Sequence, residues 1–230
     1  MSTRDAKPAR RRAEPLVAQA YAELKRRILD HEYPAGHQAT EPDVAADLGM
    51  SRTPVREALI RLAQEGLVEV VPRRGMRVVP LSPADMQEIY EVLTALESEA
   101  AGLAARPRPD PRRFDALATA VDDMAVALKD RDLLAWAAAD ERFHRALLDL
   151  SGNRRLIALA VTMWDQVHRS RLATVRLRPL PSRSNTEHRA LLAALRRGDA
   201  ERAHDLHRRH RRRTARMLIS LLKQHAMDAV

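Results

Sequence analysis

The order of elements that residues 41–79 predict constrains the fold more than any other feature of the chain. Residues 43–48 carry the apolar spacing of a short helix, Gly49 supplies a tight turn, and a second helix follows at once. Two short runs rich in β-branched residues come next, 67–71 and 76–79, with a four-residue loop between them. A helix, a glycine turn, a second helix and a hairpin predict a winged helix-turn-helix.

The second helix of this motif has one apolar stripe and one polar face. Its stripe consists of Val55, Ala58, Leu59 and Leu62. Arg56 lies outside this stripe, so it faces solvent or a ligand. Because arginine can bond bidentately to guanine in the major groove, this helix is a candidate for reading DNA.

Residues 51–75, SRTPVREALIRLAQEGLVEVVPRRG, closely resemble the winged helix-turn-helix of the GntR family of bacterial regulators, and the similarity runs from about Tyr21 to Val79. The resemblance implies that the second helix enters the major groove and that the wing tip reaches the minor groove. Some relatives also carry a DNA-contacting arginine early in the first motif helix, where this chain has Pro42. The DNA contacts that the resemblance implies are Arg52, Thr53, Arg56, Arg73, Arg74 and Gly75.

The remainder of the chain repeats its apolar residues at helical spacing only. Breaks at 107–111, Gly152, 179–181 and Gly198 separate the predicted helices, of which the last four cover 132–150, 154–177, 186–197 and 199–224. We therefore expect a mainly α protein, in which a winged helix-turn-helix with a small β-hairpin precedes an all-α helical bundle. The expected parts are a flexible basic arm at 1–14, a DNA-binding domain at 15–80 and a helical domain at 81–230.

Composition limits which classes of partner and which cellular compartment the sequence favours. The net charge of +9 favours anionic partners, of which nucleic acid is the commonest. The chain has no cysteine, which excludes disulfides and thiolate metal sites and suits a reducing compartment. No apolar run is long enough to span a bilayer, and the basic N-terminus lacks the apolar stretch of a signal peptide. We expect a cytoplasmic protein without a membrane partner.

Polar residues interrupt the apolar faces of three predicted helices. Asp140 falls in the middle of the face that Trp136 and Phe143 define, and His144 follows one turn later. His188 and His210 lie on the apolar sides of the two last helices. Burying a carboxylate is costly unless it is paired or bound to a metal. One acid and three imidazoles from three helices suit a borderline divalent cation such as zinc, nickel or manganese.

Residues 83–222 look like the FCD ligand-binding domain of the FadR subgroup of GntR regulators. The matching pieces are DERFH at 140–144, SGN at 151–153, EH at 187–188, and GD at 198–199 followed by His210. The resemblance implies that a metal ion held by Asp140, His144, His188 and His210 helps to bind a carboxylate effector. Many relatives have an arginine early in this domain where this chain has Leu93.

A substitute for that missing arginine comes from the helix expected at 154–177. Arg171 falls on its apolar side and is our candidate for binding the effector's anionic group. The alternative is that Arg171 pairs with a buried acid such as Asp140 or Asp165. The arginine run within residues 208–213 wraps most of its helix, and we interpret it as a solvated or interdomain face.

The sequence therefore predicts a transcriptional regulator, not an enzyme, whose homodimer binds an inverted-repeat operator in double-stranded DNA and responds to a small organic acid. Two alternatives stay open. In the first, the metal ion itself is the signal and no organic effector binds. In the second, the helical domain is a metal-dependent hydrolase attached to a DNA anchor, which would need a general base beside the metal.

Overall fold

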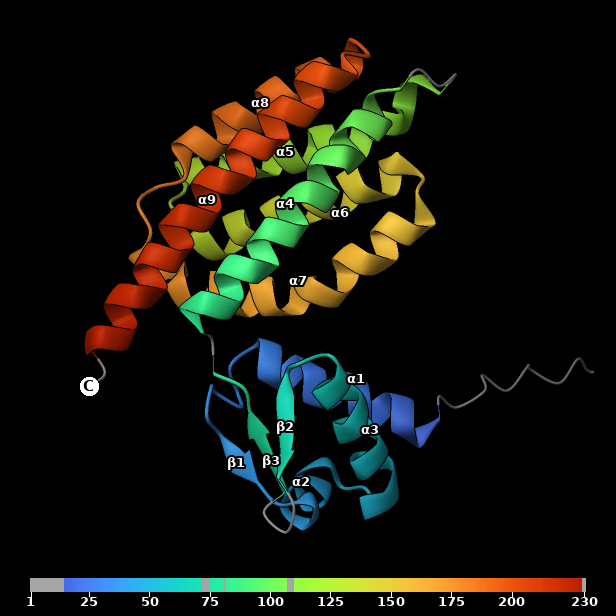
Figure 1. Ribbon diagram of the computed structural model, residues 1–230, viewed down its shortest axis with the longest axis vertical. Helices are drawn as coiled ribbons and strands as arrows, with labels where there is room; N and C mark the ends of the chain where they lie inside the picture. The colour runs from blue at the N-terminus through green and yellow to red at the C-terminus, as the bar shows by residue number, and fades with distance from the viewer. Residues whose placement is uncertain (1–14, 72–74, 81, 107–109, 229–230) are drawn as a thin grey trace, which may run out of the picture. The chain divides into compact units, whose positions relative to one another are not determined.

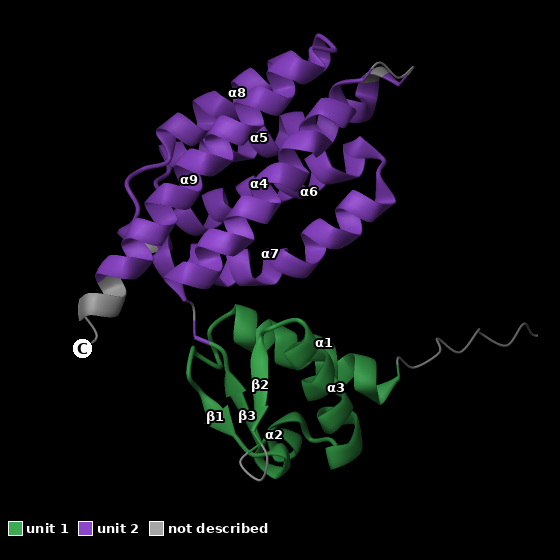
Figure 2. Ribbon diagram, in the orientation of Figure 1, with its two compact units in different colours: residues 1–79 green, residues 80–230 purple. Residues whose placement is uncertain are grey.

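The computed structural model describes residues 15–71, 75–80, 82–106 and 110–228, and it confirms the predicted fold class (Figure 1). The chain divides between Val79 and Pro80 into two compact units, which Figure 2 colours separately. The arm expected at 1–14 and the wing residues Arg73 and Arg74 lie outside the described residues. Within the described part of the chain, no helix has the length and apolar character needed to cross a membrane.

The N-terminal unit packs three helices against a small antiparallel sheet. In the sheet β3 lies between β1 and β2, and Glu69 pairs with Arg77 in the β2–β3 hairpin. The apolar core beneath it includes Leu24, Leu59 and Met76. The elements are α1 (Leu16–Leu29), β1 (Gln38–Ala39), α2 (Glu41–Leu48), α3 (Arg52–Gln64), β2 (Val68–Val71) and β3 (Gly75–Val78).

Local chemistry explains where the two motif helices begin and end. Thr40 and Asp43 form a reciprocal capping box at the start of α2, and Gly49 adopts a left-handed conformation, with φ of 61°, at its end. α3 then begins at Arg52, directly after Ser51. The sequence did not predict β1, because a strand of two residues is too short to carry an alternating pattern.

The C-terminal unit is a bundle in which α4 runs along α9 (Figure 1). The predicted helix at 154–177 is α-helical only to Thr174 and ends in a tighter 3-10 turn, Val175–Leu177. α8 begins at Ser182 rather than at residue 186. A proline restricts the backbone of the residue before it, so Pro181 does not prevent a helix from beginning directly after it. The helices are α4 (Pro83–Ala105), α5 (Asp115–Lys129), α6 (Leu133–Ser151), α7 (Arg154–Thr174), α8 (Ser182–Arg196) and α9 (Ala200–Asp228), with a further 3-10 turn at Pro111–Phe114.

Two apolar clusters form the core of this unit. One gathers residues of α5, α6 and α8, including Phe143, and the other gathers residues of α4, α7 and α9, including Leu93. Along α9, the buried polar residues fall between Ala203 of the first cluster and Ala215 of the second. The two clusters thus leave a polar layer within the bundle, and the candidate site lies in it.

Candidate functional site

Helix α6 places Asp140 and His144 on one buried face. The helix is capped at its start by the Asp132 side chain, which accepts hydrogen bonds from two backbone amides, and it ends at Gly152 in a left-handed conformation. A spacing of four residues puts Asp140 and His144 one above the other. Both side chains are buried, as the sequence predicted.

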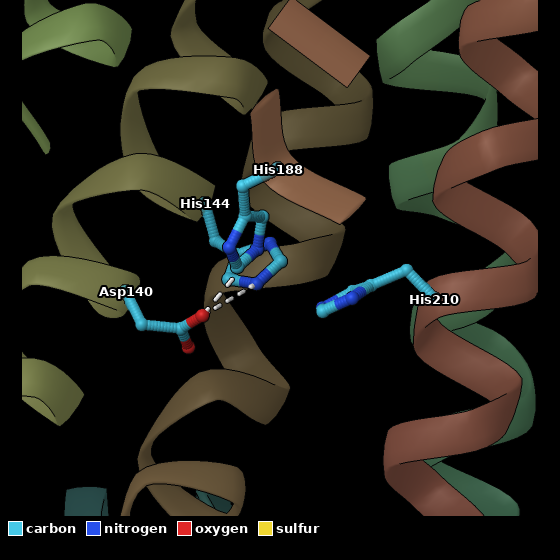
Figure 3. A group of neighbouring side chains, drawn as sticks. All are labelled: Asp140, His144, His188 and His210. Carbon is cyan, nitrogen blue, oxygen red and sulfur yellow. Dashed lines mark ion pairs between the residues drawn. The ribbon is translucent and has the colours of Figure 1, made fainter. Parts of the chain in front are cut away.

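Helices α8 and α9 bring the other two predicted ligands to the same point. His188 and His210 are buried, and their rings lie 4.6 Å apart between centroids. One ligand atom from each of Asp140, His144, His188 and His210 lies within 4.8 Å of the others. Figure 3 shows these four side chains pointing toward one another. Asp140 Oδ1 lies 3.4 Å from His188 Nε2 and 3.7 Å from His144 Nε2.

Polar atoms of these side chains that lack hydrogen bonds indicate that the group fits a divalent cation. Among the described residues, Asp140 Oδ1 and both ring nitrogens of His144 and His188 are buried without a hydrogen bond. Bonds of about 2.1 Å place two ligands of one ion at most about 4.2 Å apart, so closing the group requires only small side-chain movements. A cation at this point would satisfy atoms whose burial is otherwise costly.

The protonation states suit the same role. Burial lowers the pKa of His144 and His188 well below the usual range, and nearby cationic groups including Arg211 lower it further. Burial also lowers the pKa of His210 to about 4, although a hydrogen bond with Glu187 opposes the shift. All three imidazoles are therefore neutral near pH 7, and the neutral form is the one that binds metals.

Two further residues, Glu187 and Arg171, hold predicted ligands by hydrogen bonds. Glu187 Oε2 lies 2.7 Å from His210 Nδ1, which leaves Nε2 of this ring for a cation. Arg171 donates to Asp140 Oδ2 and leaves Oδ1 facing the histidines. The structure thus shows the pairing that the sequence left open as the alternative for Arg171. Behind His144, Glu97 Oε2 lies 3.5 Å from Nδ1.

Glu97 is the centre of a buried polar network that sequence reasoning missed. It accepts hydrogen bonds from Trp164 Nε1 at 3.1 Å and from Arg211, and its Oε2 lies 2.9 Å from His207 Nε2. Burial alone would raise the pKa of Glu97, but the charge of Arg211 and the hydrogen bonds of Arg211 and His207 hold it well below the usual range. The network joins α4, α7 and α9 behind the His144 ligand.

The solvated face expected for the arginine run is wrong for Arg211, which is 2% exposed. His207 on the same helix is buried as well. A signal was present in the sequence. His207 and His210 continue the helical spacing of Ala203 and Thr214, and Glu97 lies between Leu93 and Ala100 at the same spacing. A buried acid such as Glu97 needs a buried cation such as Arg211 to compensate its charge, but helical spacing alone does not identify which residues form the pair.

A cavity of about 200 Å³ opens beside the predicted ligands. Asp140, His144 and His210 form one part of its wall, and apolar side chains such as Trp136 and Met217 form another. Its cationic lining consists of Arg171, Arg178, Arg183, Arg211 and Arg213. A positively charged cavity with metal-ligating side chains in its wall can bind a small anion.

In the N-terminal unit, the predicted DNA contacts of α3 are exposed. The side chains of Arg52 and Arg56 are 69% and 71% exposed, and each lies nearly 4 Å from Glu41 on α2. Thr53 is exposed between them. Gly75 has φ of 87°, and a Cβ there would overlap the backbone of Ala39, so the fold itself requires this glycine.

A winged helix-turn-helix with exposed arginines on its second helix, joined to a helical bundle, defines a class of DNA-binding transcriptional regulators. The comparisons give the family. Residues 16–78 match the model for bacterial regulatory proteins of the gntR family, and residues 88–213 match the FCD domain. The chain belongs to the GntR family and carries an FCD domain as its C-terminal unit.

Relatives and solved structures agree with this assignment. An HTH-type transcriptional regulator of Agrobacterium vitis, encoded in the TAR-I ttuE-ttuC' intergenic region, is 47% identical over 57% of this chain and 78% of its own. Another, from an unstable DNA locus of Streptomyces ambofaciens, is 34% identical over 84% of this chain and 80% of its own. E. coli McbR/YncC has a similar fold, with a TM-score of 0.74 at 23% identity over 92% of this chain and 99% of that one. The two relatives from Agrobacterium vitis and Streptomyces ambofaciens are transcriptional regulators rather than enzymes.

Proposed function

We propose that this transcriptional regulator changes its affinity for DNA when a small organic acid binds beside a divalent metal ion in the helical unit. The observation that carries the proposal is the cavity whose wall combines Asp140, His144 and His210 with five arginines. A metal ion and guanidinium groups are both partners for carboxylate oxygens. A ligand that prefers one conformation of the protein shifts the population toward it, and the DNA affinity changes accordingly.

Zinc, nickel or manganese suits the proposed metal site. The donors are three neutral imidazoles and one carboxylate, without a thiolate, and this set is common to all three ions. Asp140, His144, His188 and His210 would hold the ion. It would act as a Lewis acid that binds an oxygen of the effector, while the protein fixes the position of the ion.

The test of the effector role uses the full chain loaded with zinc. Small carboxylic acids are added one at a time, and both the melting temperature and the affinity for DNA are measured. We expect at least one acid to raise the melting temperature and to change DNA affinity, because a ligand that binds the native state stabilises it. Asp140→Ala should remove both responses. DNA binding that responds to zinc alone and to no acid would instead support a metal-responsive regulator.

For the DNA-binding unit we propose that α3 enters the major groove, where Arg52, Thr53 and Arg56 contact DNA. Arg73, Arg74 and Gly75 of the wing are proposed as further contacts. A homodimer would place two such helices about one DNA turn apart and would match an inverted-repeat operator. Light scattering of the purified chain tests the dimer, and a monomer mass at working concentration would contradict it.

The test of α3 measures binding to a site selected from random DNA. Arg56→Ala should weaken binding to this site by about five- to 100-fold and should weaken nonspecific binding much less, because a bidentate arginine–base contact contributes about 1–3 kcal/mol of discrimination. Arg142→Ala is the matched control, since it removes the same charge from the other unit, where Arg142 pairs with Asp123 at 2.8 Å. Equal losses in the two variants at one salt concentration would contradict a base contact.

A further inference from the structure

The arginines that line the cavity differ in their partners. Four of them are paired with acids, so their charges are largely compensated within the protein. Arg183 and Arg213 share Glu187, at 3.0 and 2.6 Å. The other pairs are Arg171 with Asp140 and Arg211 with Glu97.

Arg178 is the exception, because no carboxylate that the structure describes forms an ion pair with it. Its Nε and Nη2 donate to Thr174 Oγ1 at 3.1 and 2.8 Å, and Nη2 also donates to the carbonyl oxygen of Arg171 at 2.8 Å. These bonds hold the guanidinium at the C-terminal end of α7. Burial lowers the pKa of Arg178 to about 10, so the group is charged near pH 7.

The remaining nitrogen of Arg178 is available to a ligand. Nη1 makes no hydrogen bond within the part of the chain that the structure describes, and an arginine Nη1 carries two N–H donors. Thr214 lines the same cavity, and its buried Oγ1 has no partner among the described residues. A bound anion would pair with the charge of Arg178 and accept a hydrogen bond from Thr214 Oγ1.

Helix α4, the first helix of this unit, supplies no cation to the cavity. Leu93 of α4 is fully buried in an apolar cluster, and no described residue of α4 lines the cavity. The uncompensated cation therefore comes from the connection between α7 and α8.

We propose that Arg178, with Thr214, binds a second anionic group of the effector while the metal ion binds the first, so that the effector is a small acid with two anionic groups. This inference rests on the proposed effector function.

The test compares matched acids by calorimetry on the zinc-loaded full chain. Malonate, succinate and glutarate are measured beside propionate, butyrate and valerate, in each of which a methyl group replaces one carboxylate. The dicarboxylate that fits best should bind the wild type about ten- to 100-fold more tightly than its matched monocarboxylate, because charged hydrogen bonds supply a difference of this size. In Arg178→Gln this ratio should fall to about one, with the affinity for the monocarboxylate unchanged.

Two further variants keep the test decisive. Arg142→Gln removes the same charge from a side chain of the helical unit that pairs with Asp123 and does not line this cavity, so it should leave the ratio unchanged. Arg178→Lys keeps the charge and loses the planar fork, so it should retain a reduced preference for dicarboxylates. This variant provides the measurement if the Gln variant does not fold. Tryptophan fluorescence and zinc content check the fold of each variant.

The outcomes separate this inference from the function on which it rests. If the wild type binds matched acids with equal affinity, or if Arg178→Gln keeps the preference, the role of Arg178 is overturned and the effector function stands. If no carboxylic acid of either series binds, both are overturned. An equal loss of the preference in Arg142→Gln would also overturn the inference, because any loss of positive charge would then have the same effect.

Discussion

Replacing Arg211 with methionine tests whether the buried network behind the metal ligands stabilises the helical unit. The side chains of Glu97 and Arg211 are 1% and 3% exposed, so neither charge is solvated by water. Arg211→Met keeps an unbranched side chain of similar length and removes the charge. Glu97 would then remain buried with only the hydrogen bonds of His207 and Trp164.

The expected cost follows from this loss of compensation. Removing one partner of a buried ion pair costs about 3–5 kcal/mol, because the remaining charge is left without a counter-charge. The contacts with His207 and Trp164 remain, so we expect a value near the lower end, about 3 kcal/mol. The double variant Glu97→Gln with Arg211→Met leaves no charge and retains an acceptor for Trp164. Its stability should return to within about 1 kcal/mol of the wild type.

Tryptophan fluorescence during urea unfolding provides the assay. The chain has two tryptophans, Trp136 and Trp164, and both are buried in the helical unit. The signal therefore reports on this unit within the full chain. With a dependence on urea of about 2 kcal/mol per molar, the Arg211→Met midpoint should fall by about 1.5 M.

A matched control removes an exposed arginine. Arg142→Met breaks an ion pair whose partners are about half exposed, and it should shift the midpoint little, since exposed ion pairs contribute little to stability. Our reasoning is refuted if Arg211→Met shifts the midpoint no more than Arg142→Met does. It is also refuted if the double variant is as unstable as Arg211→Met, because the cost would then not arise from an uncompensated charge.

Three glycine substitutions should differ in the size and the sign of their effects. Gly75→Ala should destabilise the N-terminal unit by well over 1 kcal/mol, because its φ is positive and the new Cβ would overlap the backbone of Ala39; Gly49→Ala, with open space around it, should cost only about 1 kcal/mol. Hydrogen exchange of peptides from residues 16–71 measures both, and equal effects would contradict the close contact. Gly102→Ala in α4 should stabilise the helical unit by about 0.5–1 kcal/mol, because the nearest atoms would be 3.6 Å away; a lower urea midpoint would show that α4 and α9 tolerate no added methyl group.

The sequence predicted the DNA-binding unit well because its signals are local. A glycine turn, helix caps and a hairpin each depend on residues that are close in the chain, and the apolar spacing of α3 separated Arg56 from the core. The four proposed metal ligands could also be predicted, since each interrupts an apolar face of its own helix. Their convergence was a hypothesis that depended on how three helices pack.

The network around Glu97 could not be predicted in the same way. Glu97 and Arg211 are 114 residues apart in the chain, and nothing in the local pattern of either helix identifies the other as its partner. Dense arginines also concealed Arg211, because its neighbours Arg209 and Arg212 do face solvent and only the phase of the helix distinguishes it. The proposed role of Arg178 could not be predicted from the sequence either, because it depends on which of the other arginines already pair with acids.

Metal content of the purified full chain is the most direct test of the account. The protein is loaded with zinc, nickel or manganese, passed through a desalting column and analysed for bound metal. We expect one tightly held ion per chain in the wild type, none in the double variant Asp140→Ala with His210→Ala, and a full ion in His204→Ala, whose histidine lies on the same helix outside the group. A wild type without metal, or a double variant that retains a full ion, would contradict the metal site on which the account depends.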